Sequence, residues 1–435
     1  MPPQQPQNLL PLRSIYRPKN KLLLIAALLF ASTAPCHARD FYVSPSGDNT
    51  TGHSWATALR TIPPLSFGIS PVQPGDKVII DGGTSGITYT QSLDIGVSGT
   101  ATSPIVIRQS NQAGHNGPVT LSGGPPGPFR QPVGARLSGN YVQLYGSARG
   151  GLKFTNYQFQ GIVVNGSNNR LQNIEIANIW GPPVNPGHIP GQGLVFGGTN
   201  NTYYSLDVFN CNNLVQQGFS SGPSVHRFSH CWIFDTYNRT GKGLMLQLNR
   251  DDSSVLVANC AFGPGLSQSL VNNSTAGQLN VNNTLFLNAG TDNLALAEGV
   301  GTSKSHFKNI TSFMTPTNSQ GATHNNVNYN SAGKLSARDS IFYGGFIKAD
   351  STARAAASGN FQYNVLGNTV LLAPTLQDPM FRDAAQINAL TGSTTLKVQA
   401  STDFSLAAGS QANGKGSAVT SIGLLNKNFA NYFFP

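Results

Sequence analysis

A short phrase recurs along the middle of the chain, in which a polar residue, usually Asn, precedes a brief run of alternating apolar and polar residues. The clearest copies lie at 172–176, 229–233, 258–262, 282–286, 308–313 and 338–342. Measured between the Asn-like positions, the copies from 229–233 onward are spaced within the range of roughly 24 to 32 residues that indicates a solenoid. Alternation over so few residues predicts strands, and such strands cannot close a core alone. The pattern therefore predicts strands that stack coil upon coil.

Further strand-like runs precede the repeats, and Gly, Pro and Asn turns separate them. They lie at 40–43, 77–80, 105–107, 119–121 and 142–144. Segment 54–62 is the only early stretch whose pattern fits a short helix, which we expect to cap the first coil, because a solenoid end otherwise exposes apolar surface and strand edges. These patterns predict an all-β chain, a single-stranded solenoid with a short N-terminal cap.

The recurring Asn side chains are predicted to be structural. Coils stacked at the strand spacing of about 4.8 Å place equivalent side chains above one another, so that their amides can form a hydrogen-bonded ladder. Asn also tolerates the left-handed backbone of a tight corner. We assign this role to Asn173, Asn259, Asn283 and Asn309.

The N-terminus is typical of an export signal. Four basic residues precede an apolar run at 22–30, and 36–38 offers small residues before a cut after position 38. We therefore expect a signal peptide at 1–38 and a secreted, periplasmic or cell-surface protein at 39–435, without a membrane span. Within it, 39–100 is the predicted cap with the first coils, and 370–435 forms irregular last coils.

Charge and cysteine content narrow the function classes. Removal of the signal leaves 23 of the 27 Lys and Arg against 17 Asp and Glu, a net charge of +6. The basic residues are not clustered, which argues against nucleic acid and favours hydroxyl-rich or mildly anionic partners. Three cysteines remain, Cys211, Cys231 and Cys260, an odd number without zinc-site spacing. Cys231 and Cys260 share one repeat position, which we expect to be buried.

Several segments resemble a known superfamily. The chain is similar to secreted right-handed parallel β-helix proteins of the pectate-lyase-like superfamily at both of its ends. The early segments that carry this resemblance are FYVS (41–44), WATA (55–58), QPGDKV (73–78), SGTA (98–101) and PIVI (104–107), and the late ones are DPMF (378–381) and DFSL (403–406). This superfamily includes polysaccharide lyases, alginate epimerases and glycosidases. The resemblance implies a right-handed parallel β-helix and an anionic polysaccharide partner. It is much less specific for a lyase-like reaction, because proteins with one fold catalyse many different reactions.

One candidate site is the densest run of charged residues. Arg239, Lys242 and Arg250 are candidate catalytic residues, and Asp251 and Asp252 are candidate oxygen ligands for Ca²⁺. In the superfamily, acidic residues often hold Ca²⁺ while Lys or Arg from adjacent coils acts on the uronate. A neighbouring positive charge that lowers its pKa would suit Lys242 or Arg250 as the base. The alternative is a solvated loop with local ion pairs of little consequence.

A second candidate follows from aligning the repeats. Glu175 and Asp207 fall in one outward column on successive coils, about one strand spacing apart. Such a pair binds a cation, shares a proton or serves glycoside hydrolysis. The sequence interval between Glu175 and Asp207 is the longest among the aligned repeats. A purely structural role for the two carboxylates is the alternative.

Aromatic residues at coil edges are candidate sugar platforms. They are Trp180, Tyr203, Tyr204, Trp232 and Tyr237, and the irregular insertion that follows Trp180 and contains His188 is a candidate wall of a substrate cleft. Packing at the coil edge is the alternative.

Taken together, these patterns predict an exported β-helix that acts on a uronate-containing polysaccharide as a lyase-like enzyme. A glycan-binding surface or matrix protein without activity, and a glycoside hydrolase that uses paired carboxylates, remain alternatives.

Overall fold

The computed structural model describes residues 38–313, with gaps, and four short stretches beyond them at 325–329, 334–343, 346–348 and 361–363. The gaps within the first range are 67, 69, 126–129, 180, 182–190, 219–221, 237–242, 264, 266–267, 275, 288–291 and 297–303. Every regular element in this part of the chain is a β-strand. The short helix expected at 54–62 is therefore wrong: the segment is a series of turns, and its Leu59 forms an isolated bridge to Val43.

The strands form three sheets, which we call A, B and C. Sheet A contains β1 (Asp40–Val43), β2 (Lys77–Ile80), β5 (Ile105–Gln109), β8 (Val142–Tyr145), β11 (Arg170–Gln172), β14 (Thr202–Tyr204), β17 (Ser224–Ser229), β20 (Ser253–Ala258), β23 (Gln278–Asn282), β26 (Lys304–Lys308) and β29 (Lys334–Arg338). Sheet B contains β4 (Leu93–Ile95), β7 (Val133–Leu137), β10 (Gln160–Val164), β13 (Gln192–Phe196), β16 (Asn213–Gln217), β19 (Leu244–Leu248), β22 (Gln268–Asn272), β25 (Asp292–Leu296), β28 (Asn325–Tyr329) and β31 (Phe346–Lys348). Sheet C contains β3 (Ile87–Tyr89), β6 (Val119–Ser122), β9 (Leu152–Thr155), β12 (Ile174–Ile179), β15 (Asp207–Cys211), β18 (Trp232–Thr236), β21 (Ala261–Phe262), β24 (Leu285–Leu287), β27 (Thr311–Phe313), β30 (Ile341–Tyr343) and β32 (Phe361–Tyr363).

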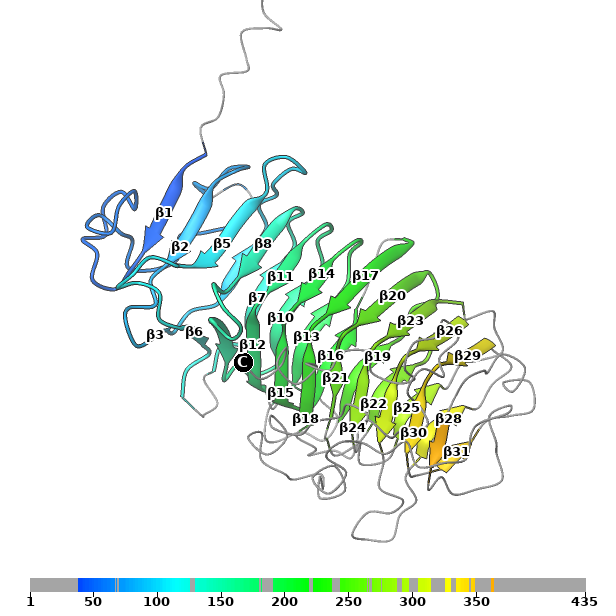
Figure 1. Cartoon of the computed structure of the whole chain (residues 1–435). Helices are drawn as coiled ribbons and strands as arrows, with labels where there is room; N and C mark the ends of the chain where they lie inside the picture. Colours follow the sequence, from blue (N-terminus) through cyan, green and yellow to red (C-terminus); the bar gives the residue numbers. More distant parts are fainter. Residues whose placement is uncertain are drawn as a thin grey trace, which may run out of the picture. The chain divides into compact units, whose positions relative to one another are not determined.

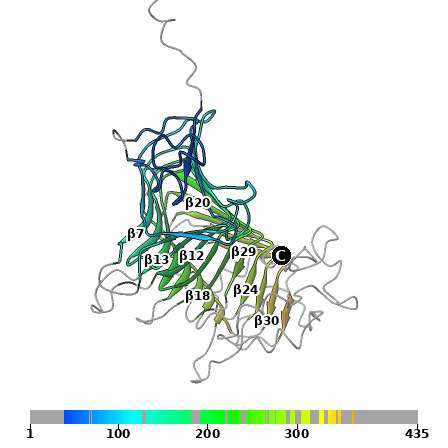
Figure 2. The same cartoon turned by 90° about the vertical axis from the view of Figure 1, so that its left-hand side faces the viewer.

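From β2 onward the chain visits the sheets in the repeating order A, C, B, and each strand pairs in parallel with its equivalents in the coils before and after it. Figure 1 shows the strands of sheet A side by side in chain order from β1 to β29, and Figure 2 shows the coils from a second side. The expected architecture, a right-handed parallel β-helix, is confirmed. The strands predicted at 40–43, 77–80, 105–107, 119–121 and 142–144 are also present.

The core lies inside the coils, where the apolar residues of all three sheets meet. Cys211, Cys231 and Cys260 are fully buried there, so the expected inward position of the last two is confirmed. The Asn-rich corner connects sheet A to sheet C. All four predicted ladder residues adopt the left-handed conformation, with φ of 57° at Asn173, 53° at Asn259, 45° at Asn283 and 53° at Asn309. Asn283 Nδ2 donates to Asn259 Oδ1 at 2.6 Å, as a ladder requires.

A buried histidine interrupts the apolar core. His226 on β17 is fully buried, its ring lies 5.0 Å from that of Phe196, and neither ring nitrogen has a hydrogen-bond partner among the described residues. Burial lowers its pKa to about 4, because the charged ring would lose its hydration without compensation. The core therefore holds this histidine in its neutral form.

Acid should weaken the fold through His226. An unfolded histidine takes up a proton near pH 6.5, whereas the folded one does so near pH 4, so the free energy of unfolding falls by about 3 kcal/mol as the pH drops through this window. Replacing His226 by Leu should remove this part of the acid sensitivity, which urea titrations at several pH values will measure. The matched variant His306→Leu, at an exposed position of β26, should keep it. An unchanged pH slope in His226→Leu would refute the assignment.

No helix among the described residues is long and apolar enough to cross a membrane. The predicted signal peptide and the irregular last coils at 370–435 lie outside the described residues, apart from Ala38, and both boundaries stay predictions.

Candidate functional site

Three charged side chains stand in one outward column of sheet C. Lys153 on β9 is in register with Glu175 on β12, which is in register with Asp207 on β15. The prediction that Glu175 and Asp207 share a column on successive coils is therefore confirmed. Figure 1 shows β12 and β15 next to each other in this sheet. Each residue is partly exposed, so the column faces outward from the helix.

A fourth charge enters this column from a loop. Arg149 lies between β8 and β9, where residues 146–151 replace the tight corner found in later coils. Its Nε donates to both carboxylate oxygens of Asp207, at 3.1 and 3.0 Å, and its Nη1 donates to the backbone oxygen of His230 at 3.0 Å. The side chains of Arg149 and Asp207 are only 12% and 16% exposed. The guanidinium thus reaches past the coil of Glu175 and joins its own coil to the coils of Asp207 and His230, through a largely buried ion pair and a hydrogen bond.

Gln109 of the preceding coil holds the loop that carries Arg149 in place. Gln109, a buried residue at the end of β5, accepts hydrogen bonds from the backbone N–H and hydroxyl of Ser147 at 2.9 and 3.0 Å. Its amide donates in turn to the backbone oxygens of Asn116 and Gly117. Gly150 follows Arg149 with φ of 67°, a conformation that glycine adopts without steric cost. Arg149 is therefore presented by a loop with a defined shape.

The charged side chains of the column form two ion pairs, Lys153 with Glu175 and Arg149 with Asp207. Lys153 Nζ lies 3.0 Å from Glu175 Oε2, and the two side chains are 33% and 24% exposed. Burial raises the pKa of the Asp207 carboxyl; Arg149 opposes this shift, and Glu175 adds to it. Lys153 has three donors and a partly exposed head, so it keeps the capacity to bind a further anion.

Next to this column, His230 and Tyr204 lie at the corner between sheets A and C. His230 takes the place that Asn occupies in other coils and has φ of 58°. Its ring centroid is 5.0 Å from that of Tyr204, and its Nδ1 lies 2.7 Å from the hydroxyl of Ser229. Burial, and then the charge of Arg149, lower the pKa of His230 below its usual value. The imidazole is therefore neutral near pH 7, the state in which it accepts a proton.

Two of the expected sugar platforms are buried instead. Tyr203 is fully buried, because it points inward between the outward positions Thr202 and Tyr204 and stacks on Phe228 with centroids 4.5 Å apart. Trp232 follows Asp207 in the outward column but is only 6% exposed, stacks on Phe234 at 3.9 Å and donates its Nε1–H to the backbone oxygen of Gly263. Their assignment to substrate binding is wrong, since neither ring face is available to a sugar.

The charged run at 250–252 lies at the far end of β19. Arg250 pairs with Asp252 at 3.2 Å, both side chains being about 30% exposed, and this contact raises the pKa of Arg250. A base needs the opposite shift, so this position does not support Arg250 as the base.

The carboxylates do not fit a calcium site. Within the described ranges, no three His, Cys, Asp or Glu side chains converge on one point. Asp207 is held by Arg149 and Glu175 by Lys153, whereas Ca²⁺ takes six to eight oxygen ligands. Asp251 is exposed and Asp252 is engaged by Arg250. We therefore derive no step through a metal ion.

Five predicted site residues fall outside the residues that the structure describes: Arg239, Lys242, Trp180, His188 and Tyr237. Four residues of the corner were not predicted as catalytic: Arg149, Lys153, Tyr204 and His230. Extending the alignment one coil back would have placed Lys153 in the column of Glu175. Arg149 gives no such signal, because only the folded loop brings it to Asp207, 58 residues away.

Comparison with known proteins identifies the fold. No family model and no curated protein sequence matches the chain. Among solved structures, the pectate lyase Pel9A has a TM-score of 0.59 at 17% identity, over 90% of this chain and 96% of the lyase. A variant of the alginate lyase AlyGC, of polysaccharide lyase family 6, has a TM-score of 0.51 at 15% identity, over 82% of this chain and 56% of that chain. The chain has the pectate-lyase-like fold. At such identities the likeness establishes this β-helix fold alone, so the reaction must be argued from the site.

Proposed function

We propose that the protein is an exported lyase that cleaves a uronate-containing polysaccharide by β-elimination at the corner of sheets A and C. The observation that carries the proposal is a neutral histidine next to a tyrosine and a column of paired charges. His230 and Tyr204 lie together, and Arg149 joins His230 to the column of Lys153, Glu175 and Asp207. The fold shared with a pectate lyase and an alginate lyase supports this class of reaction as an analogy.

Each residue has a role that follows from its surroundings. Lys153, positioned by Glu175, stands three coils before the coil of His230, about 14 Å along the stack, so it pairs with the carboxylate of a neighbouring uronate and holds the chain. His230 removes the proton on the carbon next to the carboxylate of the uronate at the corner, with Nε2, since Ser229 occupies the Nδ1 side of the ring. The electron pair of the C–H bond forms the new carbon–carbon double bond, and the C–O bond to the leaving sugar breaks. Tyr204 donates its phenolic proton to the departing oxygen.

Arg149 takes no direct part in this scheme. Its Nε and both terminal nitrogens are already committed to Asp207, Ser205 and the backbone of His230. It positions His230, and its charge adds to the effect of burial in lowering the pKa of that ring.

The direct test is a lyase assay on the purified protein. Pectate, alginate and a glycosaminoglycan are incubated with it, with and without Ca²⁺, and the absorbance of the unsaturated product is followed. We expect absorbance to rise with at least one of the three polymers. New reducing ends without absorbance would instead indicate hydrolysis by Glu175 and Asp207, and binding without cleavage of any polymer would refute both enzymatic functions.

A further inference from the structure

Charge is segregated among the three sheets of the helix. The strands of sheet A contain eight Lys or Arg residues and a single acidic residue, Asp40, at the N-terminal edge. The strands of sheet C contain one Lys and three acidic residues, and those of sheet B two of each sign. The positive charge of the described strands is therefore concentrated in sheet A.

Most of these cations lack an acidic partner among the residues that the structure describes. Lys77 lies 3.6 Å from Asp40. Five others are exposed and form no ion pair with any residue that the structure describes: Arg170, Arg227, Lys304, Lys308 and Arg338. Arg170 and Arg227 stand in one column with His306, and Lys308 stands directly opposite Arg338.

Such an arrangement costs stability unless an anion is present. Like charges directly opposite each other on neighbouring strands destabilise a sheet, and exposed Lys308 is in register with exposed Arg338. No aspartate or glutamate occurs in any strand of sheet A from β2 to β29, so these strands supply no compensating charge.

Between the cations, sheet A presents amides, hydroxyls and tyrosine rings. Gln143, Gln172, Thr202, Asn280 and Asn282 occupy outward positions of its strands and are at least partly exposed. Tyr145 and Tyr204 do the same on β8 and β14. Hydrogen-bonding side chains interspersed with flat aromatic faces suit a hydroxyl-rich chain better than the dense phosphate backbone of a nucleic acid, which requires clustered Lys and Arg.

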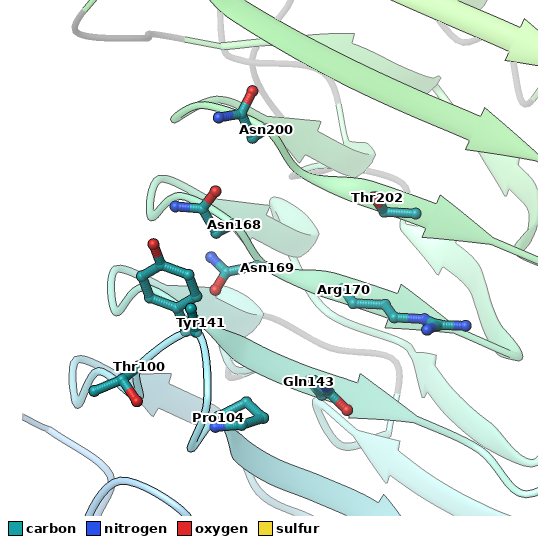
Figure 3. Close-up of a pocket in the computed structure, with 10 residues that line it drawn as sticks. Thr100, Pro104, Tyr141, Gln143, Asn168, Asn169, Arg170, Asn200 and Thr202 are labelled. Atoms are coloured by element: carbon teal, nitrogen blue, oxygen red, sulfur yellow. The ribbon is translucent and has the colours of Figure 1, made fainter.

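The edge of this face is hollowed. A pocket of about 250 Å³ is lined by residues of four successive coils, including Tyr141, Asn168, Arg170 and Asn200. Figure 3 shows Tyr141, Asn168 and Asn200 at the turns that enter the strands, with Arg170 extending along β11 between Gln143 and Thr202. The pocket is open to the same side as the cations and offers a place for one sugar residue at the margin of the face.

We propose that the outer face of sheet A, from Arg170 to Arg338, is a binding surface for a length of acidic polysaccharide outside the reacting corner. Six strand spacings separate β11 from β29, about 29 Å, so the ligand is a chain that runs across the strands. The carboxylates of the chain pair with the unpaired cations, and its hydroxyls bond the amides. The class of glycan rests on the proposed function; the surface itself requires no catalysis.

The test compares two variants that lose the same charge. Arg227→Gln/Lys308→Gln removes two cations of sheet A, and Arg60→Gln/Arg136→Gln removes two exposed cations elsewhere on the chain. Binding of long pectate and alginate chains is measured by affinity electrophoresis, with dextran as the neutral control. We expect the sheet A variant to bind about fivefold more weakly, since exposed charge pairs contribute little individually, and the control variant to be close to wild type. Added salt should weaken wild-type binding, because exposed charges are screened.

The outcomes separate this surface from the proposed reaction. Three results would overturn the proposal. Equal weakening of binding in both variants would mean that only the net charge matters, and stronger binding to single-stranded DNA than to either glycan would identify a different ligand. The third is absence of wild-type binding to either glycan at low salt. If the surface binds as expected and no polymer is cleaved, the reaction fails and the surface stands. If cleavage occurs, the sheet A variant should raise KM for the polymer and leave kcat on a short oligosaccharide unchanged.

Discussion

Replacing His230 by Asn is expected to lower kcat on the preferred uronate polymer by about 10²–10⁴-fold, the usual contribution of a positioned base. Asn is the informative substitution because Asn173, Asn259, Asn283 and Asn309 occupy equivalent corners with the same left-handed backbone. The variant therefore keeps the corner and loses only the imidazole. Steady-state kinetics at saturating polymer will measure the effect.

Two controls accompany this variant. His53→Asn, at an exposed position near the N-terminal edge, should retain wild-type activity. In the wild type, the acid limb of the pH–rate profile should lie below the ordinary histidine pKa of about 6.5, because burial and Arg149 lower the pKa of His230. Activity within threefold of wild type in His230→Asn would remove the histidine from the mechanism.

Replacing Arg149 by Met should destabilise the fold by about 4 kcal/mol at pH 7, since it leaves a largely buried carboxylate without its partner. The pKa of Asp207 is already raised by burial and should rise further in the variant. A raised carboxyl pKa costs stability as the pH rises from the unfolded value near 4 toward the folded value, so the loss should be smaller at pH 4 than at pH 7. Urea denaturation at both pH values will measure it.

The second substitution Asp207→Asn should restore most of the stability lost in Arg149→Met, because it removes the buried charge. The matched control is Arg250→Met, which breaks the more exposed pair with Asp252 and should cost less than about 1 kcal/mol. Equal losses in the two single variants, or no recovery in the double variant, would contradict the role of burial.

Much of the fold is readable in the sequence because it repeats. Asn173, Asn259, Asn283 and Asn309 mark corners, and the short apolar runs beside them are strands, since stacking at one strand spacing forces equivalent residues into equivalent places. The register also follows, which is why Glu175 and Asp207 were correctly placed in one column.

The alternation of apolar and polar residues along a strand is a weaker guide to whether an individual aromatic side chain is buried. Tyr203 and Tyr204 are adjacent, and a shift of one residue exchanges the inward and the outward position. Only the register with neighbouring coils places Tyr203 inside and Tyr204 outside. Trp232 is outward by register and still buried, because Phe234 covers it.

The sequence by itself determined that this protein is a parallel β-helix of Asn-cornered coils, because a repeat fixes both the strands and their stacking. Only the tertiary structure brings together the side chains of the proposed site and of the proposed binding surface. Arg149 reaches Asp207 and His230 from a loop without the repeat, and the cations of sheet A share a face only because strands some 24 to 32 residues apart stack about 4.8 Å apart. Contacts across coils depend on how loops fold over the stack, which periodicity does not encode.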